Sequence, residues 1–248
     1  MKNSYALITG ASSGIGEEIA KNLAKKGYNL ILTARREDLL DKLAQDLRKK
    51  YNIDVSVIAK DLSKYETPKE ILSFCEKNNY RVDLLVNNAG YGIKTSFHET
   101  SLEDEEDFIR VLGTSVIMLT KLFLPKMISN GEGKIMIVSS TAAFAPPSAI
   151  QPLYGPIKTF VNRFSDSINI NYKNKGITST AVCPGFTVTG FHTASGVQEQ
   201  MDRVPDFLVF SAKRIADEAV QATLAGKSLC VPTKTYKFLV FMLKILPH

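Results

Sequence analysis

Tyr154 and Lys158 are the residues of this sequence whose types and spacing most directly suggest chemistry. They are four positions apart, so on a helix they would share one face. A tyrosine ionises near pH ~10, and an ammonium beside it favours the phenolate and lowers that pKa. Tyr154 could then donate a proton to a carbonyl oxygen that is being reduced, or accept one from an alcohol that is being oxidised. Ser140, at the end of an expected strand, could hold the same oxygen.

A glycine-rich turn near the amino terminus indicates what could lie beside this pair. The apolar run 5–8 leads into Thr9–Gly16, and apolar residues at helical spacing follow. A helix that begins in such a turn directs its first free amides, and the positive end of its dipole, at a phosphate. Gly10 would permit the sharp exit from the strand, and Gly16 would let the helix pack closely. The residues expected to form this nucleotide-binding turn are Gly10, Ser12, Ser13, Gly14, Ile15 and Gly16.

Each of these features has an ordinary explanation by itself, because tyrosine–lysine pairs often form plain helix faces and glycine clusters often mark plain turns. Their common position at strand ends favours the chemical interpretation. Strands are expected near 5–8, 28–34, 54–59, 82–86, 134–138 and 178–182, and helices near 15–23, 37–50, 68–77, 99–129 and from 153. This alternation predicts a single α/β domain with a doubly wound parallel sheet and helices on both faces. Ligands bind such sheets at the carboxyl ends of the strands.

The residues after the second strand predict which dinucleotide would bind. Arg35 and Arg36 directly follow that strand, at the position that lies beside the adenosine ribose in sheets of this kind. An acid there would bind the ribose 2′-hydroxyl, whereas arginines suit a 2′-phosphate. The sequence therefore predicts NADP rather than NAD. Arg35 is the better candidate, since Arg36 could equally be a surface charge where the next helix starts.

Two further strand ends carry candidate contacts. Asp61, followed by Leu62, could bond the amino group of an adenine or could cap its own turn. The side chains of the asparagine pair, Asn87 and Asn88, could tie neighbouring strands together through backbone groups. Ala89 and Gly90 would leave room for a flat ribose, although Asn-Ala-Gly alone would be read as a plain turn.

Taken in order, these segments resemble the short-chain dehydrogenase/reductase family, in its compact single-domain branch with a Rossmann-like fold. The resemblance runs from Tyr5 to about Pro232 and rests on four motifs: Thr9–Gly16, Asn87–Gly90, Tyr154 with Lys158, and Pro184–Gly185 with Thr189. It implies an NADP(H)-dependent oxidoreductase that interconverts a carbonyl and an alcohol on a small substrate.

The resemblance also implies roles for individual residues. Lys158 would bond the nicotinamide ribose, and Asp61 and Leu62 would flank the adenine. Asn88, Ala89 and Gly90 would line the ribose. Further cofactor contacts near the carboxamide and the pyrophosphate would come from the later motif, namely Pro184, Gly185, Thr187 and Thr189.

Two departures from the family pattern bear on the chemistry. The family serine usually stands thirteen residues before the tyrosine, a place that Thr141 holds here, whereas Ser140 stands fourteen before it. The neighbouring residues align better with Ser140, and Thr141 is the alternative. The asparagine that completes the family's proton relay would fall at Arg110, which has no acceptor and keeps its proton. Arg110 could lower the pKa of Tyr154 further, turn into solvent, or displace a water bound to the lysine.

Composition narrows the class of protein. The 248 residues are 44% hydrophobic and 23% charged, and the net charge of +6 is spread along helices among acids, which indicates a solvated surface rather than a nucleic-acid site. Cys75, Cys183 and Cys230 are odd in number and have no metal-type spacing, so we expect reduced thiols in a cytoplasmic protein and no metal site. Because the given sequence leads directly into an expected strand, we expect no signal peptide, and we expect no membrane span, since no apolar run approaches ~20 residues.

Two apolar segments remain. Residues 186–210 are expected to form a mobile lid that faces a lipophilic substrate, or else to fill the core or a subunit contact. The tail, residues 235–248, is expected to pack as a helix on its own domain. Contact of this tail with a membrane surface or a second subunit is the less favoured interpretation.

The sequence thus predicts an NADPH-dependent reductase of a ketone or aldehyde, active as a homodimer or homotetramer. An alternative is a cofactor-binding sensor or scaffold that lost its chemistry through Arg110 and the shifted serine. A nucleic-acid binder is supported by the net charge alone, and we expect no nucleic-acid partner.

Overall fold

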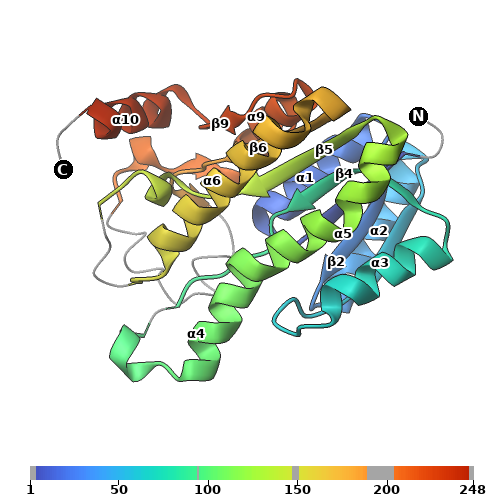
Figure 1. Ribbon diagram of the computed structural model, residues 1–248, viewed down its shortest axis with the longest axis horizontal. Coiled ribbons are helices and arrows are strands. Elements are labelled where there is room, and N and C mark those ends of the chain that lie inside the picture. Colours follow the sequence, from blue (N-terminus) through green and yellow to red (C-terminus); the bar gives the residue numbers. More distant parts are fainter. Residues whose placement is uncertain (1–3, 94, 147–150, 189–203, 246–248) are drawn as a thin grey trace.

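A seven-stranded parallel sheet forms the centre of the molecule. The structure, a computed structural model, describes residues 4–93, 95–146, 151–188 and 204–245 (Figure 1). The strand order is β3-β2-β1-β4-β5-β6-β9, and every pair of neighbours is parallel. The strands are β1 (Ser4–Thr9), β2 (Asn29–Ala34), β3 (Val55–Ala59), β4 (Arg81–Asn87), β5 (Gly133–Val138), β6 (Ile177–Val182) and β9 (Leu229–Cys230). The predicted doubly wound α/β fold is confirmed; β9 was not expected, because two residues carry no periodic pattern.

Two hydrophobic cores cover opposite faces of the sheet, because successive residues of a strand point to opposite faces. In β1, Ala6 and Ile8 belong to one core, whereas Tyr5 and Leu7 belong to the other. The helices on the first core are α1 (Gly14–Lys25), α2 (Glu37–Tyr51) and α9 (Ala212–Leu224). Those on the second are α3 (Thr67–Lys77), α4 (Leu102–Ile109), α5 (Ser115–Asn130) and α6 (Tyr154–Tyr172).

The carboxyl-terminal helix α10 (Lys234–Ile245) lies at the periphery of the molecule (Figure 1). It packs on its own domain through Tyr236 and Val240, which join a small third cluster of apolar side chains around Cys183. A short parallel ribbon and several 3-10 turns complete the described elements: β7 (Thr187–Val188), β8 (Phe210–Ser211), η1 (Phe97–Glu99), η3 (Thr141–Ala143), η4 (Lys173–Lys175) and η5 (Asp206–Leu208). Most of the expected lid, 189–203, lies outside the described residues, so the lid stays a prediction.

One long helix runs through α4, a π turn at η2 (Arg110–Thr114), and α5. A π turn closes its hydrogen bonds one residue later than an α-turn, so the face that the helix presents shifts beyond it. Within the described residues, Leu102–Asn130 is the one helix with the length and mean hydropathy, 1.5, of a membrane span, and 56% of its apolar window is buried in the protein. Its packing on the sheet accounts for that apolar character.

The helix that carries Tyr154 and Lys158 is fixed to β6 by a half-buried asparagine, Asn169. The Asn169 side-chain amide donates to the backbone oxygen of Ser179, and its Oδ1 accepts from the Ser179 backbone N–H at 2.9 Å. Strand β9 pairs with β6 only at Ala181 and Val182. At Ser179 the backbone groups on this outer edge of β6 therefore bond to a side chain instead of a neighbouring strand. The hydroxyls of Ser165 and Ser179 also bond each other at 2.7 Å. These contacts set the height of α6 above the sheet.

We predict that Asn169→Leu lowers the free energy of unfolding by about 2 kcal/mol, because it leaves a buried backbone N–H and C=O of Ser179 without their partner. Asn171→Leu is the matched control on the same helix, since the Asn171 amide is exposed and donates only to the Ser167 carbonyl of its own helix. Urea titration followed by circular dichroism measures both variants. Equal stability of the two variants would contradict the role given to Asn169.

Candidate active site

A cavity of about 460 Å³ opens at the carboxyl ends of the parallel strands. It brings together nearly all the residues that the sequence singled out: Gly10, Ser12, Ser13, Gly14, Ile15, Arg35, Arg36, Asp61, Leu62, Asn88, Ala89, Gly90, Ser140, Tyr154, Lys158, Pro184, Gly185 and Thr187. Gly16 does not line the cavity but is buried behind Gly10 and Asn88, and Thr189 lies outside the described residues. Lining residues that sequence reasoning missed are Thr33, Ala34, Lys60, Ser63, Tyr91, Asp107, Val111, Val138 and Ser139. Most of these residues are next in the sequence to a predicted site residue, and this adjacency is the signal that could have identified them.

The ends of β1 and β4 are joined by a compact set of hydrogen bonds. Thr9 Oγ1 accepts from the backbone N–H groups of Asn88 and Ala89 at 2.9 and 3.0 Å, and it donates to the Val86 carbonyl at 3.2 Å. In return, the Asn88 amide donates to the carbonyls of Thr9 and Gly10 at 2.9 and 3.2 Å. Of the asparagine pair expected to tie neighbouring strands, Asn88 does so, whereas the Asn87 amide donates to the hydroxyl of Thr120 on α5 at 3.4 Å.

This junction leaves no room for side chains at two glycines. A Cβ on Gly16 would lie 2.3 Å from the Gly10 carbonyl oxygen and 2.4 Å from the Asn88 amide nitrogen. Gly10 has φ +65°, and its Cβ would lie 2.8 Å from the Ala89 Cα. Gly16 therefore acts by letting α1 approach the strand ends, and Gly10 by forming the turn. Gly14 also has a positive φ, +60°, directly where α1 begins.

The two serines of the turn orient an arginine instead of capping the helix. Ser13 is the N-cap residue of α1, but its side chain makes no capping bond. The hydroxyls of Ser12 and Ser13 both accept from Nη2 of Arg36 at 3.0 Å. The first amides of α1 and the guanidinium of Arg36 therefore border the same end of the cavity. Such a combination of amides, hydroxyls and guanidinium suits a phosphate.

Arg35 and Asp61 also line this end of the cavity. The Asp61 carboxylate accepts from the Ser63 backbone N–H at 2.9 Å, so Asp61 caps its turn while facing the cavity. Tyr91 stands next to these groups. Burial raises the pKa of Tyr91 to about 12; Asp107 adds to this rise, and Arg35 acts against it.

Tyr154 and Lys158 begin α6 and reach the cavity from one helical turn. The Lys158 Nζ lies 5.5 Å from the centroid of the Tyr154 ring and donates to the Val138 carbonyl at 2.9 Å. The Lys158 backbone carbonyl accepts from the hydroxyl of Ser139 at 3.0 Å, which fixes this turn of α6 against the end of β5.

The structure brings Ser140, and not Thr141, to this pair. Ser140 lines the cavity and is hydrogen-bonded to Tyr154. It is also the N-cap of η3, where its Oγ accepts from the Ala142 N–H at 3.1 Å. Thr141 lies within that turn, and its backbone N–H donates to the Pro184 carbonyl.

The electrostatics of the pair differ from the expectation that Lys158 lowers the pKa of Tyr154. Burial raises the pKa of Tyr154, and the hydrogen bond with Ser140 acts in the opposite direction. Burial also lowers the pKa of Lys158 to about 8, since an ammonium loses its water there without gaining a carboxylate. The net shift of the Tyr154 pKa is therefore upward, opposite to the expected direction, because desolvation of the phenolate dominates. The Tyr154 phenol is therefore held in its protonated form.

Arg110 does not take part in this arrangement. Its guanidinium lies over the ring of Tyr65, 5.9 Å from the centroid, and it is absent from the groups that shift the pKa of Tyr154 or Lys158. The side chain of this helix nearest Gly90 is Leu112, whose Cγ would lie 3.8 Å from a Cβ on Gly90. Of the alternatives for Arg110, the structure does not show an effect on the pKa of Tyr154, because the guanidinium contacts Tyr65 instead.

Tyr236 of α10 is a neighbour of the site that sequence reasoning missed. A Cβ on Gly185 would fall 1.9 Å from the Tyr236 ring, so the ring lies flat against that glycine. The Tyr236 hydroxyl accepts from the Phe186 N–H at 3.0 Å and donates to the Leu208 carbonyl at 2.8 Å. One tyrosine thus holds both ends of the segment 186–208 beside the cavity.

Comparison with known proteins gives a consistent result. Residues 4–200 match the family model of the short chain dehydrogenases. The very-long-chain 3-oxoacyl-CoA reductase-A of Danio rerio is 32% identical over 191 residues, which cover 75% of this chain and 58% of that protein. The matched region thus spans less than two thirds of that relative.

Solved structures agree with the sequence match. The short-chain dehydrogenase from Sphingobium yanoikuyae in complex with NADPH has a TM-score of 0.85 and 27% identity, over 97% of this chain and 92% of that one. An alcohol dehydrogenase from the archaeon Thermococcus sibiricus, complexed with 5-hydroxy-NADP, has a TM-score of 0.80 and 28% identity, over 94% and 97% of the two chains. The chain belongs to the short-chain dehydrogenase/reductase family.

Proposed function

We propose that this protein is an NADP(H)-dependent oxidoreductase that reduces the carbonyl group of a small apolar substrate to an alcohol. One observation carries the proposal: Tyr154 and Lys158 open onto the same cavity as the first turn of α1 and the two arginines. A proton donor and a site for an anionic dinucleotide therefore face one space. Relatives that bind NADPH or an NADP analogue support the choice of cofactor.

The residues present fit a phosphorylated dinucleotide. At the junction of β1 and β4, glycines leave the first amides of α1 accessible from the cavity, and such amides suit the pyrophosphate. Arg35 and Arg36 would hold the 2′-phosphate, Arg36 being pre-oriented by Ser12 and Ser13. When bound, the nicotinamide supplies the hydride for reduction and accepts it in the reverse direction.

The chain's own residues would handle the proton. Tyr154 would donate the proton of its Oη to the carbonyl oxygen of the substrate as that oxygen gains negative charge. The phenol is protonated at neutral pH, since burial raises its pKa above the ordinary value. The Ser140 hydroxyl would hold the same oxygen, and the Lys158 ammonium would bond the ribose beside the nicotinamide.

We infer that the substrate is lipophilic, and we choose long-chain 3-oxoacyl-CoA thioesters as the first class to test. Two observations support this choice: the Danio rerio relative is named for that reaction, and Phe186, Val188 and Phe207 are exposed on the two stems of segment 186–208. Turnover is followed by the loss of NADPH absorbance with 3-oxoacyl-CoA substrates of short and long chain and with bulky ketones. Tight NADPH binding with no turnover on any of them would overturn the reductase proposal and support a cofactor-binding sensor.

Tyr154→Phe should lower kcat by about 10³-fold, because it removes the proton donor. It should leave the Kd for NADPH within about threefold of the parent value, since the ring stays in place. Steady-state kinetics and fluorescence titration measure the two quantities. Tyr172→Phe, at the other end of α6, is the matched control and should keep full activity. Retention of activity in Tyr154→Phe would show that another group donates the proton.

NADPH binding should weaken as the pH rises above about 8, because Lys158, whose pKa is lowered to about 8, then loses the ammonium that bonds the ribose. Below that pH the lysine is charged, and the Kd for NADPH should not change with pH. The Kd is measured against pH in both the parent and Tyr154→Phe. The same alkaline limb in both assigns it to the lysine, whereas its disappearance in Tyr154→Phe would assign it to the phenol.

The parent should bind NADPH at least about tenfold more tightly than NADH, because two guanidiniums face the 2′-phosphate. Arg36→Ala should remove most of this preference by weakening NADPH and sparing NADH, and Arg35→Ala tests the second arginine in the same way. Lys42→Ala, an exposed cation on α2, is the control. Equal affinities of the parent for the two nucleotides would refute the preference for NADP.

A further inference from the structure

We propose that the outer face of α10 is a docking surface for an anionic lipid bilayer. The helix has two apolar faces, of which its own domain covers only one. Tyr236 and Val240, four positions apart, are 5% and 4% exposed and pack against the small cluster around Cys183. On the opposite face Phe238, Phe241 and Ile245 are 63%, 59% and 57% exposed. Their spacing of three and seven residues aligns them in one stripe.

The stripe of Phe238, Phe241 and Ile245 is flanked by positive charge. Helix α10 contains Lys234, Lys237 and Lys244 and no acidic residue. The described segment 204–245 around it holds six basic and three acidic residues. Lys244 lies with its Nζ 5.0 Å from the Phe144 ring centroid, and Lys237 lies 3.5 Å from Glu218 at the inner edge. Large apolar side chains bordered by lysines are the pattern by which a helix lies in the headgroup region of anionic lipids.

Charge distinguishes a bilayer from a second copy of the chain as the occupant. A two-fold contact through this face would place the lysines of one α10 near those of the other, because such contacts are self-complementary. Anionic headgroups neutralise the same lysines while the acyl region accepts the aromatic rings. Lysine side chains can extend along the helix to reach the headgroups.

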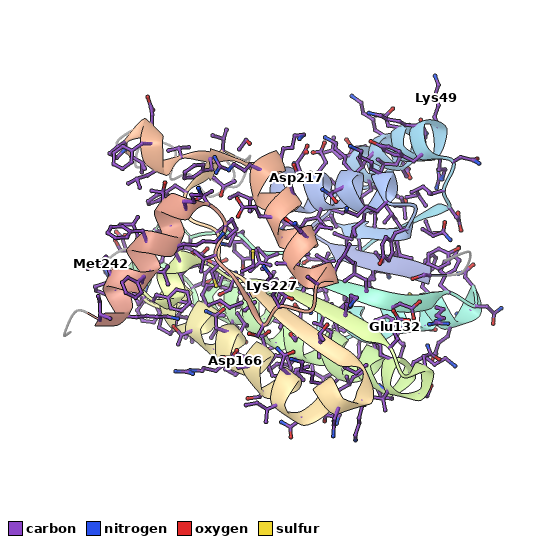
Figure 2. The ribbon with its side chains drawn as sticks, turned by 90° about the horizontal axis from the view of Figure 1, so that it is seen from above. Lys49, Glu132, Asp166, Asp217, Lys227 and Met242 are labelled. Atoms are coloured by element: carbon purple, nitrogen blue, oxygen red, sulfur yellow. The ribbon has the colours of Figure 1, made fainter. Side chains whose placement is uncertain are left out.

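The position of α10 gives this surface a consequence for the site. Tyr236, on the inner face of the same helix, bonds the backbone at Phe186 and Leu208, so the docked helix would lie beside the rim of the cavity. Figure 2 shows Met242 of α10 at one side of the molecule and Lys49 of α2 at the far side. A bilayer on α10 would thus meet the side of the protein where Tyr236 packs on Gly185, a residue that lines the cavity.

Co-sedimentation with vesicles tests the proposal independently of any activity. The parent should bind vesicles of phosphatidylcholine with one quarter phosphatidylglycerol at least ~10-fold more tightly than vesicles of phosphatidylcholine alone, and salt should weaken this binding. Phe238→Ser/Phe241→Ser should lower binding by at least ~10-fold. Lys234→Gln/Lys244→Gln should lose about fivefold per lysine on the anionic vesicles only.

Matched variants control for general changes of surface. Leu102→Ser/Ile170→Ser removes two exposed apolar residues from other helices, and Lys42→Gln/Lys49→Gln removes two exposed lysines from α2. Both should bind vesicles as the parent does, and thermal unfolding checks that every variant is folded. Absence of parent binding, equal binding to both vesicle types, or equal losses in the control variants would overturn the proposal.

Light scattering tests the other possible occupant of this face, a second copy of the chain. A parent dimer that becomes a monomer in Phe238→Ser/Phe241→Ser, without vesicle binding by the parent, would assign the face to a second copy and refute docking. If the parent turns over NADPH but does not bind vesicles, docking is refuted and the enzymatic proposal stands. If it binds vesicles but turns over no substrate, docking stands and the enzymatic proposal is refuted.

Discussion

The contact between Thr9 and the backbone of Asn88 and Ala89 is the constraint on which the rest of the site depends. It holds the ends of β1 and β4 so close that Gly10 and Gly16 have no space for a Cβ. Because Gly16 is in the first turn of α1, the same closeness presses that helix onto the sheet edge and leaves its first amides facing the cavity. The guanidinium of Arg36, which donates to both serines of the turn, adds further hydrogen-bond donors beside these amides. The anion site is therefore a consequence of tight backbone packing rather than of any single charged residue.

The second half of the site is built by burial. Helix α6 is tied to the sheet at Ser139 and at Ser179, and these ties bring Tyr154 and Lys158 to the wall of the cavity. Desolvation moves the two pKa values apart, the phenol's upward from its ordinary value and the ammonium's downward to about 8. Lys158 keeps its position through the Val138 carbonyl in the absence of a carboxylate partner.

The carboxyl-terminal helix connects two features that are distant in the sequence. Its inner face places the Tyr236 ring against Gly185 and bonds both stems of segment 186–208. Its outer face exposes the aromatic stripe proposed to meet lipid. A lipophilic substrate, a membrane surface and the rim of the cavity would then lie on one side of the molecule. The expected tail helix is present, yet only half of its apolar surface is used by its own domain, which a sequence pattern apolar on both faces could not reveal.

The sequence by itself determined the alternation of strands and helices, and through it the gathering of the glycine turn, Asn88, Tyr154 and Lys158 at one edge of the sheet. This succeeded because the period of apolar residues is local, and because parallel strands bring their carboxyl ends together whatever the intervening chain does. Only the tertiary structure decided the rest. The π turn at Arg110–Thr114 rotates the helix faces, so Arg110 meets Tyr65 while Leu112 faces Gly90. The choice of Ser140 over Thr141, the direction of the Tyr154 pKa, and the contact of Tyr236 with Gly185 depend on packing between segments far apart in the chain, which no local pattern encodes.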